Sequence, residues 1–237
     1  MEIANTRQYN GHDISTIFHD VRSRKIVIFC HGYRGTSIGP SRFFVKASRI
    51  LAKNGISSFR FDQYGSGNSE GDFMDSSFKD WEKTTQIITQ DFLDQGYTVG
   101  LLGQSMGGAT VICVGSELPA ITSIVAWAPD AGVDLFYPPK NGFIEEGGQR
   151  VQSSYWQEAY DARIADRLSN VQAPMYIVQC SDDEYVSAEN HEAIERNARP
   201  NHDVEMYNGY KHSAWTYEQA EGIINKSVQF LIRSLEA

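Results

Sequence analysis

The sequence predicts an α/β fold, with a mainly parallel, doubly wound sheet preceded by an antiparallel hairpin. Strand-like apolar runs alternate with helical segments along almost the whole chain, as expected for strands joined by helical crossovers. The run at residues 25–30, KIVIFC, is continuously apolar after Lys25, as in strands buried on both faces. Asn10-Gly11, between two strand-like stretches, is a strong hairpin signal. At 237 residues the chain has room for one such domain.

The individual elements follow from turn residues and apolar periodicity. Pro40 suits the first turn of a helix, and apolar residues then repeat with helical spacing up to Leu51. Gly96 ends the next helix. We expect a hairpin over 2–18, strands at 25–30, 57–61, 98–102, 122–128, 173–180 and 204–207, and helices at 40–51, 78–95, 106–118, 188–198 and 217–235.

The alternation breaks once, at residues 130–165, which we expect to be irregular. A connection of this length inside a compact domain commonly forms a lid or another functional segment. We therefore predict an α/β core from residues 1–129 and 166–237, and a small cap over residues 130–165.

Composition limits the classes of binding partner and the cellular compartment that we expect. The net charge of −9 disfavours nucleic acid or an anionic membrane as the main partner. The three cysteines have neither disulfide nor zinc spacing, so we expect buried, reduced thiols and no metal or cofactor. With no signal peptide and no apolar run of membrane-spanning length, the expected location is the cytoplasm. The oligomeric state stays open, with a homodimer as one alternative.

Three segments, at residues 35–39, 67–71 and 103–107, fit the serine-nucleophile pattern G-x-S-x-G. The chemistry requires a strand that ends abruptly, a strained serine and a helix that begins at once. Ser105 has this setting, with an apolar run before it and small residues after it that allow close strand–helix packing. Ser37 and Ser69 lie in glycine-rich loops and are expected to be turn residues. The context therefore predicts Ser105 as the nucleophile.

A serine hydroxyl needs a base to accept its proton and a carboxylate to orient that base. His212 is the candidate base, because it lies in a loop after the last predicted strand. In parallel sheets, ligand-binding and catalytic residues commonly lie in loops at the carboxyl ends of strands. The acid is expected in the turn at residues 181–184, where the residues alone leave the choice among Asp182, Asp183 and Glu184 open. Backbone N–H groups for the oxyanion are expected from Met106 and from the loop at residues 31–33, for which a plain glycine-rich turn is the competing interpretation.

At these residues the chain resembles the α/β-hydrolase superfamily and, within it, small bacterial cinnamoyl/feruloyl-esterase-like carboxylesterases. The matching segments are HGYRG at 31–35, FRFDQYGSGNSEG at 59–71, GQSMGG at 103–108, AP at 173–174, DEYV at 183–186 and GYKH at 209–212. The resemblance implies an α/β-hydrolase fold with Ser105 as nucleophile, His212 as base, and Tyr33 and Met106 as oxyanion donors.

The resemblance also favours Asp183 as the acid, because the family's acid is typically followed three residues later by a valine, as Val186 is here. The chain departs from the family at Gln104, where histidine is common, and at Gln179-Cys180, where His-Gly is usual. The expected cap is also shorter than in the feruloyl-type relatives.

Aromatic residues of the expected cap are candidates for an apolar acyl or aryl pocket. The alternative is that several of these rings only pack the cap onto the domain. The candidate pocket residues are Phe136, Tyr137, Phe143, Trp156 and, just past His212, Trp215.

The predicted function is a serine carboxylic-ester hydrolase that acts on a small-molecule ester through an acyl-enzyme, with feruloyl or cinnamoyl esters as one substrate class. Thioesterases, acyltransferases and peptidases use the same triad and stay open as alternatives. A non-catalytic binding protein with this fold is the alternative from another class.

Overall fold

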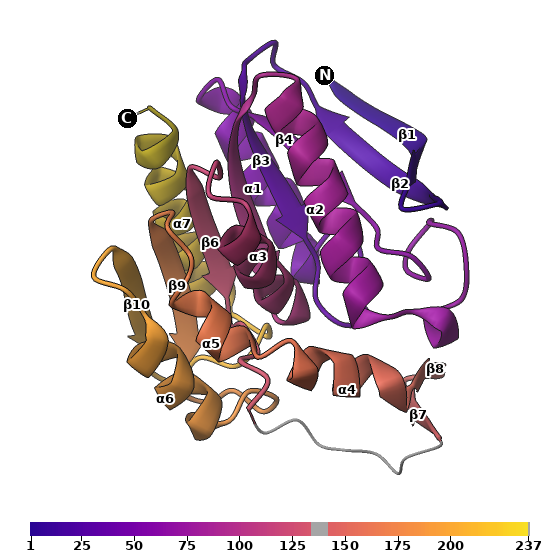
Figure 1. Cartoon of the computed structure of the whole chain (residues 1–237). Helices are drawn as coiled ribbons and strands as arrows, with labels where there is room; N and C mark the ends of the chain where they lie inside the picture. Colours follow the sequence, from indigo (N-terminus) through magenta and orange to yellow (C-terminus); the bar gives the residue numbers. More distant parts are fainter. Residues whose placement is uncertain (134–141, 237) are drawn as a thin grey trace.

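The computed structural model of the chain describes residues 1–133 and 142–236, and its main feature is a large mixed sheet with helices on both faces (Figure 1). Eight described strands follow the spatial order β1-β2-β4-β3-β5-β6-β9-β10. The pairs β1–β2 and β2–β4 are antiparallel, and every pair from β4 to β10 is parallel. This confirms the predicted fold class. The strands are β1 (Glu2–Tyr9), β2 (His12–His19), β3 (Lys25–Cys30), β4 (Ser57–Phe61), β5 (Thr98–Gln104), β6 (Ser123–Trp127), β9 (Met175–Cys180) and β10 (His202–Tyr207).

The N-terminal hairpin forms at the predicted turn. Tyr9 pairs with His12, so Asn10 and Gly11 alone make the connection. Both have positive φ, 52° and 82°, which the favoured two-residue hairpin turn requires and which Asn and Gly tolerate.

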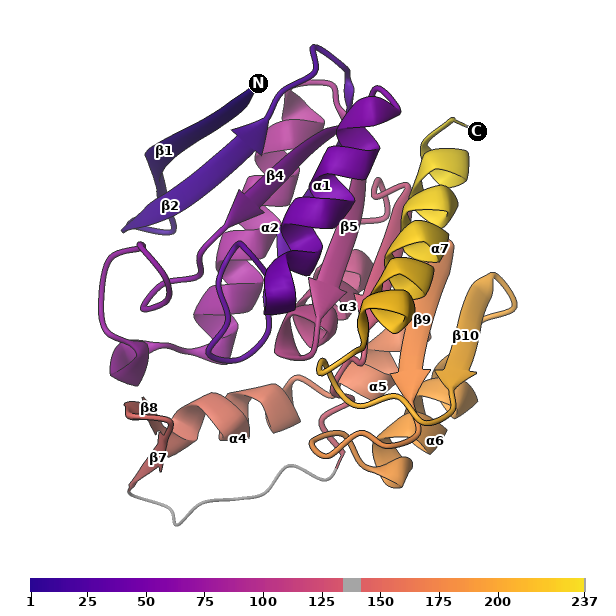
Figure 2. The same ribbon diagram turned by 180° about the vertical axis from the view of Figure 1, so that it is seen from behind.

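The apolar strands serve two hydrophobic cores, one on each face of the sheet. In β3, Ile28 and Cys30 pack on one side and Val27 and Phe29 on the other, because successive strand residues point to opposite faces. Figures 1 and 2 show α2 and α3 over the first face and α1 and α7 over the second. The helices are α1 (Phe43–Lys53), α2 (Phe78–Asp94), α3 (Met106–Glu117), α4 (Ser153–Asp161), α5 (Ile164–Leu168), α6 (Ala188–Asn197) and α7 (Tyr217–Glu236), with short 3-10 turns η1 (Pro40–Arg42) and η2 (Phe73–Asp75).

The prediction of an irregular segment at 130–165 is wrong for its described part. It contains an antiparallel hairpin, β7 (Phe143–Glu146) and β8 (Gln149–Gln152), followed by α4 and the beginning of α5. The hairpin closes through Gly147 and Gly148, both with positive φ. In both views, α4 and this hairpin lie across the carboxyl ends of the parallel strands (Figures 1 and 2). The division into core and cap stays a prediction, and α5 crosses its boundary.

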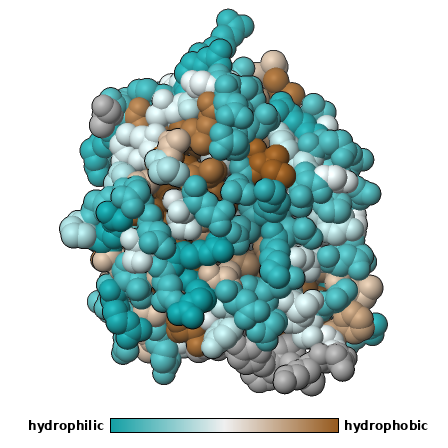
Figure 3. Space-filling view, in the orientation of Figure 1, coloured by the Kyte–Doolittle hydropathy of each residue, from teal (hydrophilic) through white to brown (hydrophobic). Residues whose placement is uncertain are grey.

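The expectations from composition can be compared with the described residues. Cys30, Cys113 and Cys180 are buried and free, as predicted. No described helix is both long and apolar enough to cross a membrane. Figure 3 shows hydrophobic residues on one face as separate patches within a mostly hydrophilic surface.

Candidate active site

Ser105 occupies a sharp turn between β5 and α3. Its backbone has φ 56° and ψ −124°, a conformation that residues with a Cβ rarely adopt. Its N–H donates to the carbonyl of Trp127 at 2.8 Å, and its carbonyl accepts from the N–H of Ala109 at 3.0 Å. Such a conformation costs about 1–3 kcal/mol and persists only where the surrounding structure enforces it. The β6 strand and the first turn of α3 supply that enforcement here.

Glycines allow this turn to pack directly against neighbouring backbone. A Cβ at Gly103 would lie 2.1 Å from the carbonyl oxygen of Gly107, and one at Gly107 would lie 2.1 Å from that of Cys30. A Cβ at Gly32 would lie 3.0 Å from the Cβ of Ser105. The loop after β3 therefore passes against the serine with no room for a side chain at residue 32.

His212 is held by a buried carboxylate. Its Nδ1 lies 2.7 Å from Oδ2 of Asp183, whose side chain is 0% exposed. The other oxygen of Asp183 accepts the backbone N–H groups of Tyr185 and Val186, each at 2.9 Å. A carboxylate at Nδ1 keeps the proton on that nitrogen and leaves Nε2 free to act as an acceptor.

The three carboxylates of the 181–184 turn have three different partners. Asp182 is exposed and accepts the hydroxyl of Ser181 at 2.8 Å. Glu184 accepts the backbone N–H of His212 at 3.4 Å. Only Asp183 contacts the imidazole, so the structure brings together the acid and base that the sequence favours, while their catalytic roles stay predictions.

Gln104 also reaches His212, which the sequence analysis did not foresee. Its amide nitrogen lies 3.3 Å from Nε2 of His212, and the residue is 5% exposed. Within the described part of the chain, the Ser105 hydroxyl has no recorded hydrogen bond, although Ser105 and His212 line the same pocket. Catalytic hydrogen bonds are often long before substrate binds. The sequence signals were that Gln104 directly precedes the serine and that it departs from the histidine common in the family at this position.

The loop at 31–33 is fixed by a neutral, buried histidine. Nδ1 of His31 bonds the carbonyl of Gly32 at 2.8 Å, and Nε2 accepts the N–H of Gln63 at 2.9 Å. Burial lowers the pKa of His31, which keeps the ring neutral and able to accept that bond. Tyr33 and Met106 both line the pocket. Met106 is the first residue of α3, so its N–H has no partner within the helix.

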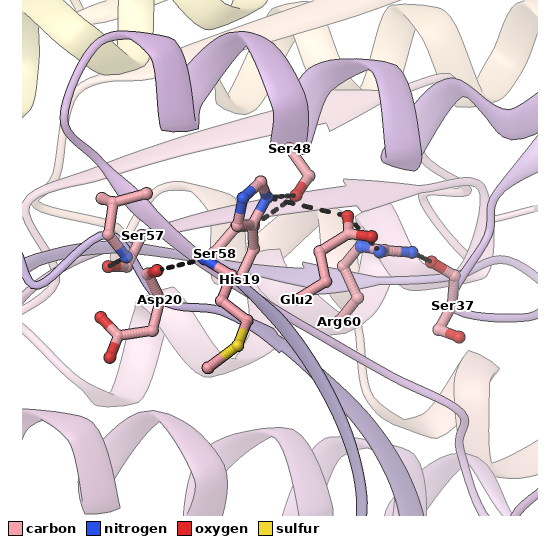
Figure 4. A network of polar contacts seen from close by, with 10 residues as sticks. Glu2, His19, Asp20, Ser37, Ser48, Ser57, Ser58 and Arg60 are labelled. Carbon is pink, nitrogen blue, oxygen red and sulfur yellow. Dashed lines mark hydrogen bonds and ion pairs between the residues drawn. The ribbon is translucent and has the colours of Figure 1, made fainter.

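The other two pattern serines take part in polar networks, and Figure 4 shows the one that contains Ser37. Ser37 donates its N–H to Asp62 at 2.6 Å and accepts from the guanidinium of Arg60 at 3.0 Å. Arg60 is 2% exposed and lies between Ser37 and Glu2, whose carboxylate is 3.3 Å away. The hydroxyl of Ser69 donates to the carbonyl of Asp62 at 2.7 Å. Neither serine is among the described residues that line the pocket.

The pocket at Ser105 has a volume of about 680 Å³. Trp156 lines it, and the centroid of its ring lies 4.8 Å from that of Tyr33. Burial raises the pKa of Tyr33 to about 12, so this phenol stays protonated. The lining comes from several regions, including the loop after β3, the turn at Ser105, the β7–α4 segment and the turn that carries His212. No group of described His, Cys, Asp and Glu residues has the arrangement of a metal site.

Two predicted pocket residues are corrected. Phe143 is 52% exposed and does not line the pocket, because alternation along β7 directs Ile144 and Glu146 there instead. Trp215 is 8% exposed and packs into the core, stacked on Phe43 at 5.2 Å. Phe136 and Tyr137 lie outside the described residues.

Comparisons with known proteins identify the family and the fold. The family model described as serine aminopeptidase, S33, matches residues 21–158, more than half of the chain. Comparison with curated protein sequences gives no significant match.

Several solved structures are similar over nearly the whole chain. Est1E from Butyrivibrio proteoclasticus, solved with ferulic acid bound, has a TM-score of 0.85 at 20% identity and covers 99% of this chain and 100% of its own. The α/β-hydrolase GrgF from Penicillium sp. sh18 has a TM-score of 0.82 at 14% identity, covering 100% of both chains. A monoacylglycerol lipase from Paleococcus ferrophilus has a TM-score of 0.79 at 18% identity, covering 93% of this chain and 99% of its own. These likenesses show the α/β-hydrolase fold.

The glycine contacts give a stability prediction. Gly103→Ala should lower the free energy of unfolding by about 1–3 kcal/mol, because the new Cβ overlaps backbone that cannot move aside. Gly222→Ala, in α7 with open space around it, should raise it by about 0.5–1 kcal/mol. Urea denaturation measures both. A Gly103→Ala protein as stable as wild type would contradict the close packing described for the turn.

Proposed function

We propose that this chain, which belongs to the serine aminopeptidase S33 family of α/β-hydrolases, is a serine carboxylic-ester hydrolase. The observation that carries the proposal is a strained serine and a carboxylate-bound histidine lining one pocket, Ser105 and His212 with Asp183. A serine, a base and an orienting acid are what an acyl-transfer mechanism needs.

In the proposed mechanism, Nε2 of His212 takes the proton of the Ser105 hydroxyl as its oxygen attacks the ester carbonyl. Asp183 stabilises the imidazolium that forms through the proton on Nδ1. The N–H groups of Tyr33 and Met106 donate to the oxygen that becomes negative. His212 then gives its proton to the departing alcohol, and water releases the acyl group from Ser105 by the same steps.

Gln104 must yield for this reaction to begin. Its amide nitrogen occupies Nε2 of His212, the acceptor that the serine hydroxyl needs, since a neutral imidazole has one acceptor site there. Substrate entering the pocket would move the amide aside and let Ser105 take its place.

Tyr33 and Trp156 line the pocket with neighbouring aromatic rings. These rings favour a substrate that has an apolar or aromatic group to pack against them. A feruloyl- or cinnamoyl-type acyl group is one such group, and ferulic acid is the ligand in the Est1E structure. We also place the protein in the cytoplasm, because its three buried free thiols suit a reducing compartment.

Replacement of the nucleophile tests the proposal. Ser105→Ala should lower kcat for p-nitrophenyl butyrate by at least about 10⁴-fold, because no other group can form the acyl-enzyme. Ser37→Ala is the matched control and should stay close to wild type, since only its backbone is bonded in the network. Turnover by Ser105→Ala at the wild-type rate would refute the assignment. An amino-acid p-nitroanilide, assayed in parallel, should be hydrolysed more slowly than the ester.

The acid is tested by exchanging carboxylates for amides. Asp183→Asn should lower kcat by about 10³–10⁴-fold, because the amide favours the wrong imidazole tautomer. Asp182→Asn should change kcat little, since the carboxylate of Asp182 bonds only the Ser181 hydroxyl among the described residues. Steady-state kinetics of the two variants decides between them, and a larger loss at Asp182 would show that the acid is wrongly assigned.

A further inference from the structure

Arg34 brings a positive charge into the pocket, directly after the proposed oxyanion donor Tyr33. It is the one lysine or arginine among the described residues that line the pocket, and its side chain is 28% exposed. Neither the triad nor the oxyanion donors use this group. Arg34 and Ser105 line the same pocket, so an ester bound at Ser105 shares that pocket with the guanidinium.

The backbone of Arg34 has a strained conformation, and its side chain packs against the β7–β8 hairpin. Its φ is 56°, a left-handed conformation in which glycine would be unstrained. The turn of the β7–β8 hairpin packs directly on the guanidinium, because a Cβ at Gly147 would lie 2.1 Å from Nη2. Strained residues of this kind cluster where a side chain has a task.

A carboxylate already occupies Arg34. Nη1 lies 3.0 Å from Oε1 of Glu146, and the two side chains are 28% and 50% exposed. An arginine fork matches a carboxylate geometrically, so this pair demonstrates the kind of ligand that the site accepts. A pair this exposed is weak, which lets another carboxylate replace Glu146.

Arg34 also has a donor left over. Its Nε is buried and has no hydrogen-bond partner among the described residues. A guanidinium has five N–H donors, and Glu146 contacts one of its nitrogens, so a substrate carboxylate that replaces Glu146 has further donors available.

The pocket also has acidic residues, which would favour a cationic substrate over an anionic one. Asp130 and Glu146 both line it, and Asp130 accepts the N–H of Gly132 at 2.8 Å. If these acids dominated the field, the pocket would prefer a cationic substrate. Asp130 is engaged by its own turn, whereas Glu146, the ion-pair partner of Arg34 among the described residues, is half-exposed and exchangeable.

We infer that Arg34 binds a carboxylate on the substrate, so that the preferred ester carries a free acid group besides the bond that is cleaved. This inference rests on the proposed esterase function and names a substrate class for it. Glu146 occupies the site when the pocket is empty and leaves it when such an ester enters.

The experiment compares kcat/KM for mono-p-nitrophenyl adipate with that for its neutral counterpart, p-nitrophenyl hexanoate. A second pair, 4-acetoxybenzoate and phenyl acetate, places the acid on the alcohol side. For at least one pair, the kcat/KM of the acidic ester divided by that of the neutral ester should fall about tenfold or more in Arg34→Gln, because a charge-assisted hydrogen bond is lost. The ratio should rise in Glu146→Gln, which removes the competitor.

Arg150→Gln is the matched control. Arg150 lies on the same hairpin and pairs with Glu145, but neither residue is among those described as lining this pocket. This variant should leave both ratios unchanged. Equal loss on acidic and neutral esters in Arg34→Gln would overturn the inference, and so would a rise in the ratio, which would indicate a pocket for cations.

Binding separates failure of this inference from failure of the esterase proposal. Calorimetry should show that monomethyl adipate binds Ser105→Ala and binds at least about tenfold more weakly when Arg34→Gln is added. This result would support the inference even if the wild-type protein hydrolysed no ester. Equal affinity for the two proteins would overturn it, even if neutral esters were cleaved with full dependence on Ser105.

Discussion

Direct contact between two stretches of backbone, the turn at Ser105 and the loop after β3, is the constraint on which the rest of the structure depends. It exists because Gly32, Gly103 and Gly107 have no Cβ. The sheet prepares it, since β3 and β5 are adjacent and Cys30 pairs with Gly103 at their carboxyl ends. The contact holds the serine in its strained conformation and places the loop that carries Tyr33 beside it. Any side chain at these glycines would separate the proposed nucleophile from the proposed oxyanion donors.

Buried polar groups also hold the loop after β3 in place, through hydrogen bonds. His31 fixes the start of the loop through two hydrogen bonds of a neutral ring, and Arg60 and Asp62 hold Ser37 further along it. Each of these four hydrogen bonds joins a side chain to a backbone group, so the loop has little freedom to move away from Ser105. Buried polar side chains therefore hold the loop after β3 in position, while Gln104 and Arg34 line the pocket itself.

Much of this arrangement could be predicted from the sequence, because the strand and helix periods and the glycine positions are local signals. The same signals separated Ser105 from Ser37 and Ser69. Side-chain direction in loops is a tertiary property, so the sequence alone could not decide between Asp182 and Asp183, and only the resemblance favoured one. The β7–β8 hairpin was missed because its strands have four residues each, too short for a clear period. Trp215 was misplaced because an aromatic residue near a site has the same pattern as one that packs the core.

The central claim is that Ser105 is the nucleophile, activated by His212. Labelling with a fluorophosphonate, followed by peptide mapping with mass spectrometry, tests it most directly, because the probe bonds only to an activated serine and the mapping identifies which one. The account predicts one adduct, on the peptide that contains Ser105, and its loss in His212→Ala. An adduct on the peptide of Ser37 or Ser69 would contradict the account, and the absence of any adduct would favour a binding protein that has this fold without the chemistry.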